Sequence, residues 1–292
     1  MCRLFGLTAS PQRVHASFWL LEAAGSLLEQ SLRNPDGTGL GYFAPVVGAV
    51  VDKEPLPAYE DPALARGAKH VSSTTFVSHI RYATTGERTT ENTHPFAIDG
   101  IIFAHNGTLQ DLNALEAHIG RDMRFVGGDT DSERYFALVA KEIRARGSIG
   151  SGISAAVGWI VENIPLSSIN FVLATADELW AFRYPETNRL FVLERRAGGG
   201  RGRRDLHHVS GTVRVHVPDL SRHPSVVVAS EPLDDSVGWR ALESGELMRV
   251  GPDLSVRSNI VVDRPPAQPI PLGHSMDENA PISGPARMVW GS

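Results

Sequence analysis

The order of strand-like and helix-like segments is the feature that most limits the folds open to this chain of 292 residues. Strand patterns come first, interrupted by one helical pattern at 17–34; three helical patterns follow, and strand patterns return after them. Such an order is compatible with two sheets covered by helices. We therefore expect one α+β domain over residues 1–264 and an extended, proline-rich tail over residues 265–292. Strands are expected at 3–9, 74–83, 100–107, 189–196, 225–233 and 246–262. A strand–turn–strand pattern is expected at 42–52, and a hairpin with its turn around Ala176-Asp177 at 168–184. The later helices are expected at 109–120, 129–147 and 150–164.

Composition argues against several classes of function. Hydrophobic residues make up 42% of the chain and charged residues 21%, which is ordinary for a folded globular protein. The formal net charge of −5 predicts no general nucleic-acid binding. No apolar run approaches the roughly 18 residues that span a bilayer, and the start of the chain lacks a signal-peptide pattern. A lone cysteine cannot form an internal disulfide, so we expect a cytoplasmic protein.

One basic stretch departs from this acidic balance. Residues 195–204 read RRAGGGRGRR, with arginines interleaved with glycines. Such a segment could grip phosphate groups, but it lacks the aromatic residues that stack on bases. Composition favours a solvated surface loop, and its role stays open.

The lone cysteine is residue 2, directly behind Met1. If Met1 is removed, Cys2 carries a thiol and a free α-amine, whose ordinary pKa values are about 8.5 and about 7.7–8.0. The amine can then accept the thiol proton near neutral pH, so one residue supplies both nucleophile and base. The alternative is a buried structural cysteine, and position alone does not decide between the two.

A thiolate that attacks an amide needs donors for the oxyanion that develops. Asn106 offers a side-chain amide, and Gly107 allows its backbone N–H to approach a ligand closely. The same dipeptide is also the commonest signal for a hairpin turn, which on its own is the simpler interpretation.

Opposite charges at fixed positions would suit an α-amino-acid substrate. Arg81 comes at the end of a predicted strand and could hold a carboxylate in a bidentate fork. Asp129 and Asp131 come at the start of a predicted helix, where a carboxylate could receive an ammonium group. Capping of that helix by Asp129, Thr130 or Ser132 is the competing explanation for this polar cluster.

The histidines and glycines do not predict a cofactor. His79, His94 and His105 lie at or near strand ends, but their spacing is not that of a metal site. The glycine-rich segments match neither a phosphate-binding loop nor a dinucleotide-binding fingerprint. We therefore expect no metal and no cofactor, and assign the histidines to hydrogen bonding around the site and to loop closure.

The order of these motifs resembles the glutaminase domain of class II glutamine amidotransferases, which are N-terminal-nucleophile hydrolases. Cys2 is followed by HIRYATTG, NTHPF, AHNG and GDTDSE, and later segments extend the likeness to about residue 260. The small standalone members, which lack a synthase domain, are the most similar. Tyr82 departs from the tryptophan that many larger relatives have after the binding arginine.

The resemblance implies a four-layer αββα sandwich of two antiparallel sheets between helical layers. It also implies roles: Cys2 as nucleophile, and Asn106 with Gly107 as the oxyanion hole. Arg81 would bind the substrate α-carboxylate and Asp131 the α-ammonium group. Two further residues would lie near the substrate: Thr84, in the loop after Arg81, and His94, in a closing loop.

The function that follows is an amidohydrolase. It would cleave the γ-amide of glutamine or of a γ-glutamyl amide through a γ-glutamyl thioester, releasing glutamate and either ammonia or an amine. One alternative is a glutaminase subunit that supplies ammonia only with a separate synthase. Another is a non-catalytic binding or regulatory protein on the same fold. A synthase partner and a homo-oligomer both stay open.

Overall fold

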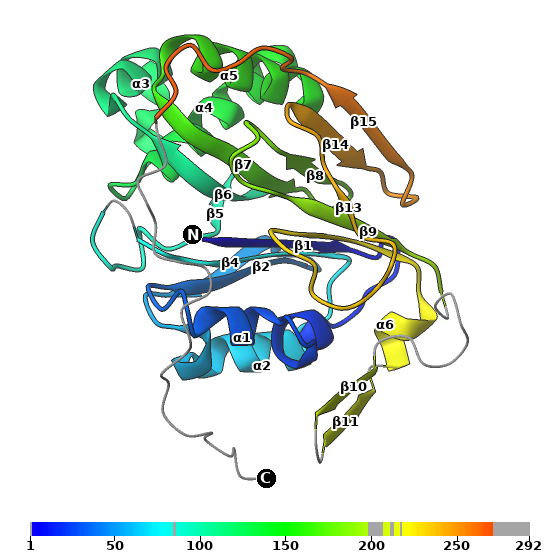
Figure 1. Ribbon diagram of the computed structural model, residues 1–292. Coiled ribbons are helices and arrows are strands. Elements are labelled where there is room, and N and C mark those ends of the chain that lie inside the picture. The colour runs from blue at the N-terminus through cyan, green and yellow to red at the C-terminus, as the bar shows by residue number, and fades with distance from the viewer. Residues whose placement is uncertain (1, 84–85, 198–206, 211–212, 217, 271–292) are drawn as a thin grey trace.

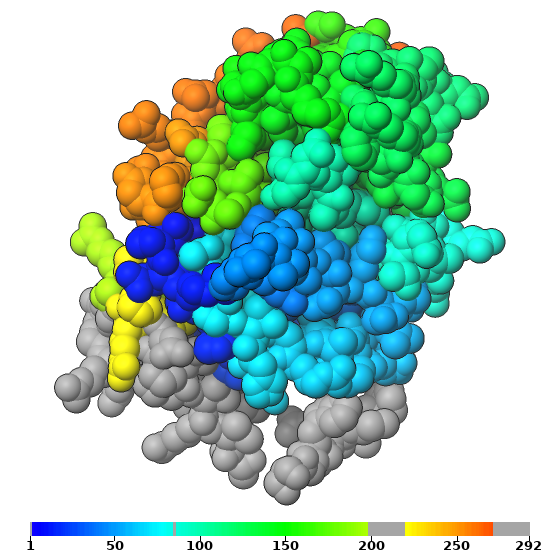
Figure 2. All heavy atoms as spheres, turned by 180° about the vertical axis from the view of Figure 1, so that it is seen from behind, coloured from blue at the N-terminus to red at the C-terminus, as the bar shows by residue number. Residues whose placement is uncertain are grey.

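The computed structural model describes residues 2–83, 86–197, 207–210, 213–216 and 218–270 (Figure 1). Two antiparallel sheets lie face to face, and each is covered on its outer side by helices. The expected αββα sandwich is therefore confirmed. Figure 2 shows the same division from behind, with the helices of residues 112–163 in green above and the N-terminal strands and helices in blue and cyan below.

The first sheet contains the N-terminal strand at its centre. Its order is β13-β9-β12-β1-β4-β2-β3, and every pairing in it is antiparallel. Its strands are β1 (Arg3–Thr8), β2 (Thr38–Ala44), β3 (Gly48–Glu54), β4 (Thr75–Ile80), β9 (Phe191–Arg195), β12 (Ser225–Ala229) and β13 (Arg240–Ala241). Helices α1 (Leu27–Ser31) and α2 (Pro62–His70) lie on its outer face (Figure 1).

The second sheet is built from the middle and the end of the chain. Its order is β15-β14-β8-β7-β6-β5, again antiparallel throughout. Its strands are β5 (Phe96–Ile98), β6 (Ile101–Leu109), β7 (Leu166–Ala174), β8 (Leu179–Phe182), β14 (Glu246–Val250) and β15 (Val256–Ile260). Its helical layer is α3 (Leu112–Ile119), α4 (Asp131–Arg146) and α5 (Ile149–Asn163). A short hairpin, β10 (His207–Ser210) and β11 (Val213–His216), forms a separate two-stranded sheet that projects below helix α6 (Pro218–Arg222) in Figure 1.

The hydrophobic core follows these layers. One buried cluster packs α4 and α5 on the second sheet, and another packs α1 and α2 on the first. A third cluster lies between the sheets and includes Leu4 and Val77 from one and Ile102 and Val172 from the other. The central strands β1 and β7 are thus covered on both faces, and every residue in them except Arg3 is buried.

The helix prediction for the N-terminal region was incomplete. The helix expected over 17–34 is divided into a π-helical turn, Phe18–Glu22, and α1. The break forms because Gly25 donates its N–H to the Leu233 carbonyl, 3.0 Å away, and Ser26 starts a new helix by accepting the Glu29 N–H. The sequence interpretation missed α2 entirely, although Asp61 caps it and Pro62 opens it.

The start of the expected tail is packed against the domain. Ala267 donates to the Val161 carbonyl, and residues 268–270 exchange backbone hydrogen bonds with Leu166 at the start of β7. The boundary at residue 264 stays a prediction, and residues 271–292 lie outside the described part. Of the arginine-rich stretch only residues 195–197 are described, and buried Arg195 donates to Ser225 Oγ at 2.9 Å. No helix within the described residues is long and apolar enough to cross a membrane.

Candidate active site

Cys2 lies where β1 begins, beside the chain that leaves β4. The two strands pair with Arg3 opposite Ile80, which brings Cys2 next to Arg81 and Tyr82. Cys2 Sγ accepts the Tyr82 N–H at 3.2 Å and lies 3.4 Å from the Tyr82 carbonyl, to which the thiol donates. The register of the first sheet therefore brings the thiol beside the segment that carries the candidate arginine.

Asn106 connects Cys2 to the second sheet. It lies in β6, and its side-chain Nδ2 donates to the Cys2 carbonyl at 2.9 Å. Asn106 and Gly107 pair with Asn170 and Ile169 of β7, so the simple hairpin-turn interpretation of this dipeptide is wrong. An ideal Cβ at Gly107 would lie 1.7 Å from the Ser168 carbonyl oxygen, so the strands can approach this closely only at a glycine.

Arg81 is a buried cation directly after β4, with 3% of its surface exposed. Its Nη1 donates to the Glu87 carbonyl at 2.9 Å, and its Nη2 donates to the Gly86 carbonyl at 3.2 Å. Burial lowers the pKa of this guanidinium, and the nearby Cys2 and Asp36 act in the opposite direction. Arginine keeps its charge in proteins, so Arg81 is a fixed positive charge near the thiol.

Asp131 is a buried anion at the first position of α4. Its Oδ2 accepts the Leu109 N–H at 2.7 Å, and its Oδ1 accepts the Ser132 N–H at 2.8 Å. Thr130 is the residue that caps α4, because its side chain accepts the Glu133 N–H. Asp129 is exposed and does not cap the helix. Of the three candidates Asp129, Thr130 and Ser132, it is therefore Thr130 that caps α4.

The thiol, the cation and the anion act on one another electrostatically. Burial raises the pKa of the Cys2 thiol, and the Tyr82 hydrogen bond and the Arg81 charge lower it. The charge of Asp131 raises the same pKa, so both charged groups lie close enough to affect the sulfur. The structure thus brings together five of the predicted residues: Cys2, Arg81, Asn106, Gly107 and Asp131.

The other two predicted residues differ from these. Thr84 lies outside the described residues. His94 precedes a cis peptide bond to Pro95, and its ring is buried, stacked on His79 with centroids 4.1 Å apart. His105 makes contacts of its own: its Nδ1 lies 2.9 Å from Ser132 Oγ. Within the described residues, no group of three or more metal-ligating side chains could hold a metal ion.

The sequence interpretation missed two residues that order the loop around Arg81. Asp36 accepts the Ala83 N–H at 2.8 Å and forms an ion pair with Arg88. Asn92 donates to the Glu87 carbonyl and accepts the Asp129 N–H. In the sequence, Asp36 lies in the turn-rich stretch NPDGTGLG and Asn92 in the NTHPF motif. Neither has a spacing that would reveal its partner in the folded chain.

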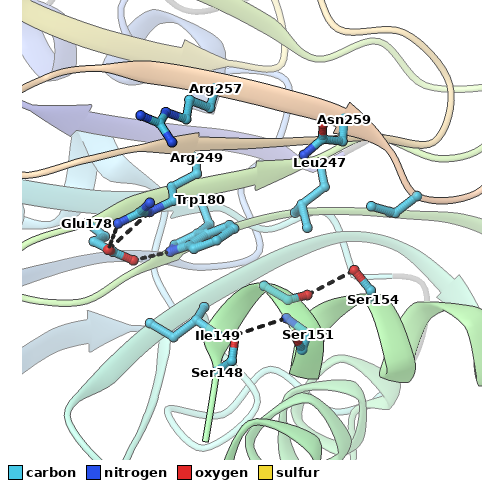
Figure 3. A pocket seen from close by; sticks show the side chains of 12 residues that line it. Ser148, Ile149, Ser151, Ser154, Glu178, Trp180, Leu247, Arg249, Arg257 and Asn259 are labelled. Atoms are coloured by element: carbon cyan, nitrogen blue, oxygen red, sulfur yellow. Dashed lines mark hydrogen bonds and ion pairs between the residues drawn. The ribbon is translucent and has the colours of Figure 1, made fainter. Parts of the chain in front are cut away.

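A cavity of about 810 Å³ lies away from these residues (Figure 3). It is bounded by the first turns of α5 and by strands β8, β14 and β15. Trp180 is part of its wall, and Glu178 pairs there with Arg249. None of the predicted site residues lines it, so this cavity is separate from the candidate active site.

Comparison with known proteins agrees with the fold and the motifs. The family model of the class-II glutamine amidotransferases matches residues 1–265. The chain is 27% identical over 256 residues to YafJ, a candidate glutamine amidotransferase of Escherichia coli, covering 84% of this chain and 96% of YafJ. It also resembles the structure of a glutamine aminotransferase class-II domain protein from Silicibacter pomeroyi, with a TM-score of 0.58, 19% identity and coverage of 89% and 99%.

A longer enzyme shares the same fold. The glutamine phosphoribosylpyrophosphate amidotransferase of Bacillus subtilis superposes with a TM-score of 0.60 at 17% identity, covering 90% of this chain and 50% of that one. Because the family model spans nearly the whole described chain, the protein is a member of the class II glutamine amidotransferases.

Proposed function

We propose that this protein is an amidohydrolase that uses Cys2 as an N-terminal nucleophile on the γ-amide of glutamine or of a γ-glutamyl amide. The observation that carries the proposal is the meeting of a thiol, a buried cation and a buried anion at Cys2, Arg81 and Asp131. An α-amino acid carries a carboxylate and an ammonium group on one carbon. Paired buried charges beside a nucleophile match that head group.

The first half of the reaction forms a thioester. After removal of Met1, the α-amine of Cys2 takes the thiol proton, and the sulfur attacks the γ-carbonyl carbon. The oxyanion that forms receives hydrogen bonds from Asn106 and from the backbone of Gly107. Asn106 Nδ2 has two N–H groups, so one can donate to the Cys2 carbonyl while the other faces the substrate. The protonated α-amine then gives its proton to the leaving nitrogen, and ammonia or an amine departs.

The second half of the reaction regenerates the enzyme. Water adds to the thioester carbonyl, the α-amine accepts a proton from that water, and the C–S bond breaks. Glutamate leaves, and the sulfur recovers its proton. The same amine thus serves as base in both halves, with no other titratable side chain required.

The test is to incubate the purified chain with glutamine and with a series of γ-glutamyl amides and to measure glutamate. Release of glutamate by the chain alone supports a standalone amidohydrolase. The amide with the highest kcat/KM then identifies the leaving group. If a chain whose N-terminus is Cys2 releases no glutamate from glutamine or from any of the γ-glutamyl amides, the proposal is contradicted.

A second candidate function is an ammonia-supplying subunit. The chain covers half of the Bacillus amidotransferase, which places the likeness in one part of that longer enzyme. A subunit of this kind would release glutamate from glutamine only when a separate synthase is added. The same assay, repeated with candidate synthases, distinguishes the two functions.

A further inference from the structure

Asn92 joins two loops that come from different parts of the chain. Its side chain is buried, with 1% of the residue exposed. Nδ2 donates to the Glu87 carbonyl at 3.2 Å, and Oδ1 accepts the Asp129 N–H at 2.7 Å. Both ends of one amide are therefore bonded to backbone groups about 40 positions apart in the sequence.

The first loop is the one that holds Arg81. The Glu87 carbonyl that receives Asn92 Nδ2 also receives Arg81 Nη1, at 2.9 Å. The adjoining Gly86 carbonyl receives Arg81 Nη2. Because Asn92 and Arg81 donate to the same Glu87 carbonyl oxygen, a shift of Asn92 would also displace the Arg81 guanidinium.

The second loop leads directly into Asp131. Gly127 and Gly128 donate their N–H groups to the carboxylate of Glu133, at 3.1 and 2.7 Å. These bonds tie the loop to helix α4 independently of Asn92. An ideal Cβ at Gly128 would lie 2.4 Å from Asn92 Oδ1, so a glycine is needed for this close approach. Asn92 thus attaches the Arg81 loop to a loop that is already fixed on α4.

We infer that Asn92 is a positioning residue that sets the separation between Arg81 and Asp131 in the amino-acid site. The inference rests on the proposed function, because it assumes that these two charges bind one substrate. The α-carboxylate and the α-ammonium share a carbon, so their binding groups must be held to within about 0.5 Å. A misplacement of about 1 Å can cost about a hundredfold in rate or binding.

The experiment measures binding of L-glutamate, the expected product, by calorimetry. Asn92→Ala removes both hydrogen bonds and should weaken glutamate binding about tenfold to a hundredfold. Asn92→Asp keeps the acceptor for Asp129 but loses the donor to Glu87, and should weaken binding as well. The control is Asn163→Ala, which removes a side-chain bond from an exposed asparagine to the Trp159 carbonyl and should leave binding unchanged.

Two ligands that lack one charged end separate positioning from general destabilisation. Glutarate lacks the α-ammonium group, and 4-aminobutanoate lacks the α-carboxylate. The wild-type protein should prefer glutamate strongly over both, and the Asn92 variants should show a smaller preference. A loss of affinity that is equal for all three ligands, or no loss at all, would overturn the inference.

Hydrogen exchange keeps the inference testable if the proposed function fails. If the wild-type protein neither binds nor releases glutamate, the function is wrong, but the link between the loops can still exist. Backbone amides of residues 86–93 should then exchange faster in Asn92→Ala than in the wild-type protein. Unchanged exchange in that segment would overturn the structural link itself.

Discussion

The stacked pair of His79 and His94 makes stability depend on pH in a way that can be calculated. Both rings are buried between the two sheets, with 0% and 4% of each residue exposed. Neither ring nitrogen of either histidine has a hydrogen-bond partner in the described part of the chain. Burial, together with the nearby His105 and Arg81, lowers the pKa of His79 to about 3. Burial likewise holds the pKa of His94 well below its ordinary value.

The sign of the effect follows from which state binds the proton. An unfolded histidine has a pKa of about 6.5, so it gains a proton as the pH falls below that value. The folded His79 stays neutral down to a pH of about 3. The unfolded state therefore binds more protons between these limits, and the stability that is present above pH 6.5 is lost as the pH falls. When the pH falls from 7 to 5, the titration of His79 alone should lower the free energy of unfolding by about 2 kcal/mol.

The assay is urea unfolding at pH 7 and at pH 5, with wild-type protein and with His79→Phe. Phenylalanine keeps a ring against His94 but cannot titrate. The free energy of unfolding should therefore fall by about 2 kcal/mol more in the wild-type protein than in the variant. His70→Gln, which removes an exposed imidazole, is the matched control. Equal losses in wild type and His79→Phe would refute the reasoning, because His79 would then titrate alike in both states.

The remaining predictions concern the site itself. Arg81→Lys should lower kcat/KM for glutamine about tenfold to a hundredfold, chiefly through KM, because an ammonium cannot reproduce a bidentate fork. Unchanged steady-state kinetics would mean that another cation binds the carboxylate. Gly107→Ala should lower the free energy of unfolding by about 3 kcal/mol, because the added Cβ would overlap the Ser168 carbonyl. A variant that unfolds at the same urea concentration as the wild-type protein would contradict this packing. Cys2→Ala should abolish glutamate release while unfolding in urea changes by less than about 1 kcal/mol; residual turnover would exclude the thiol as nucleophile.

The features that could be predicted from the sequence are those that depend on local pattern. The strand before Arg81 is rich in β-branched and aromatic residues, and the helix that starts at Asp131 has a polar start and arginines in its last turn. These elements carry the candidate residues, so their order along the chain indicated the site. The family resemblance added the sheet-on-sheet arrangement, which periodicity alone does not specify.

The features that could not be predicted depend on contacts distant in the sequence. Asn106-Gly107 has the composition of a turn, and only its pairing with β7 makes it a strand. The break at Gly25 requires the Leu233 carbonyl, more than 200 residues away. Asn92 acquires its importance from the Asp129 N–H, which comes from another loop. Such partners are fixed by tertiary packing, and no local propensity reveals them.

The central claim is that Cys2 is the first residue of the active chain and that its thiol attacks a glutamyl carbonyl. The most direct test is intact-mass analysis of the purified protein before and after reaction with a glutamine analogue that carries an electrophilic carbon in place of the γ-amide. The account predicts a chain that lacks Met1 and gains one adduct, located on Cys2 by peptide mapping and prevented by excess L-glutamate. A chain that retains Met1 yet hydrolyses glutamine, or an active chain that the analogue leaves unmodified at Cys2, would contradict it.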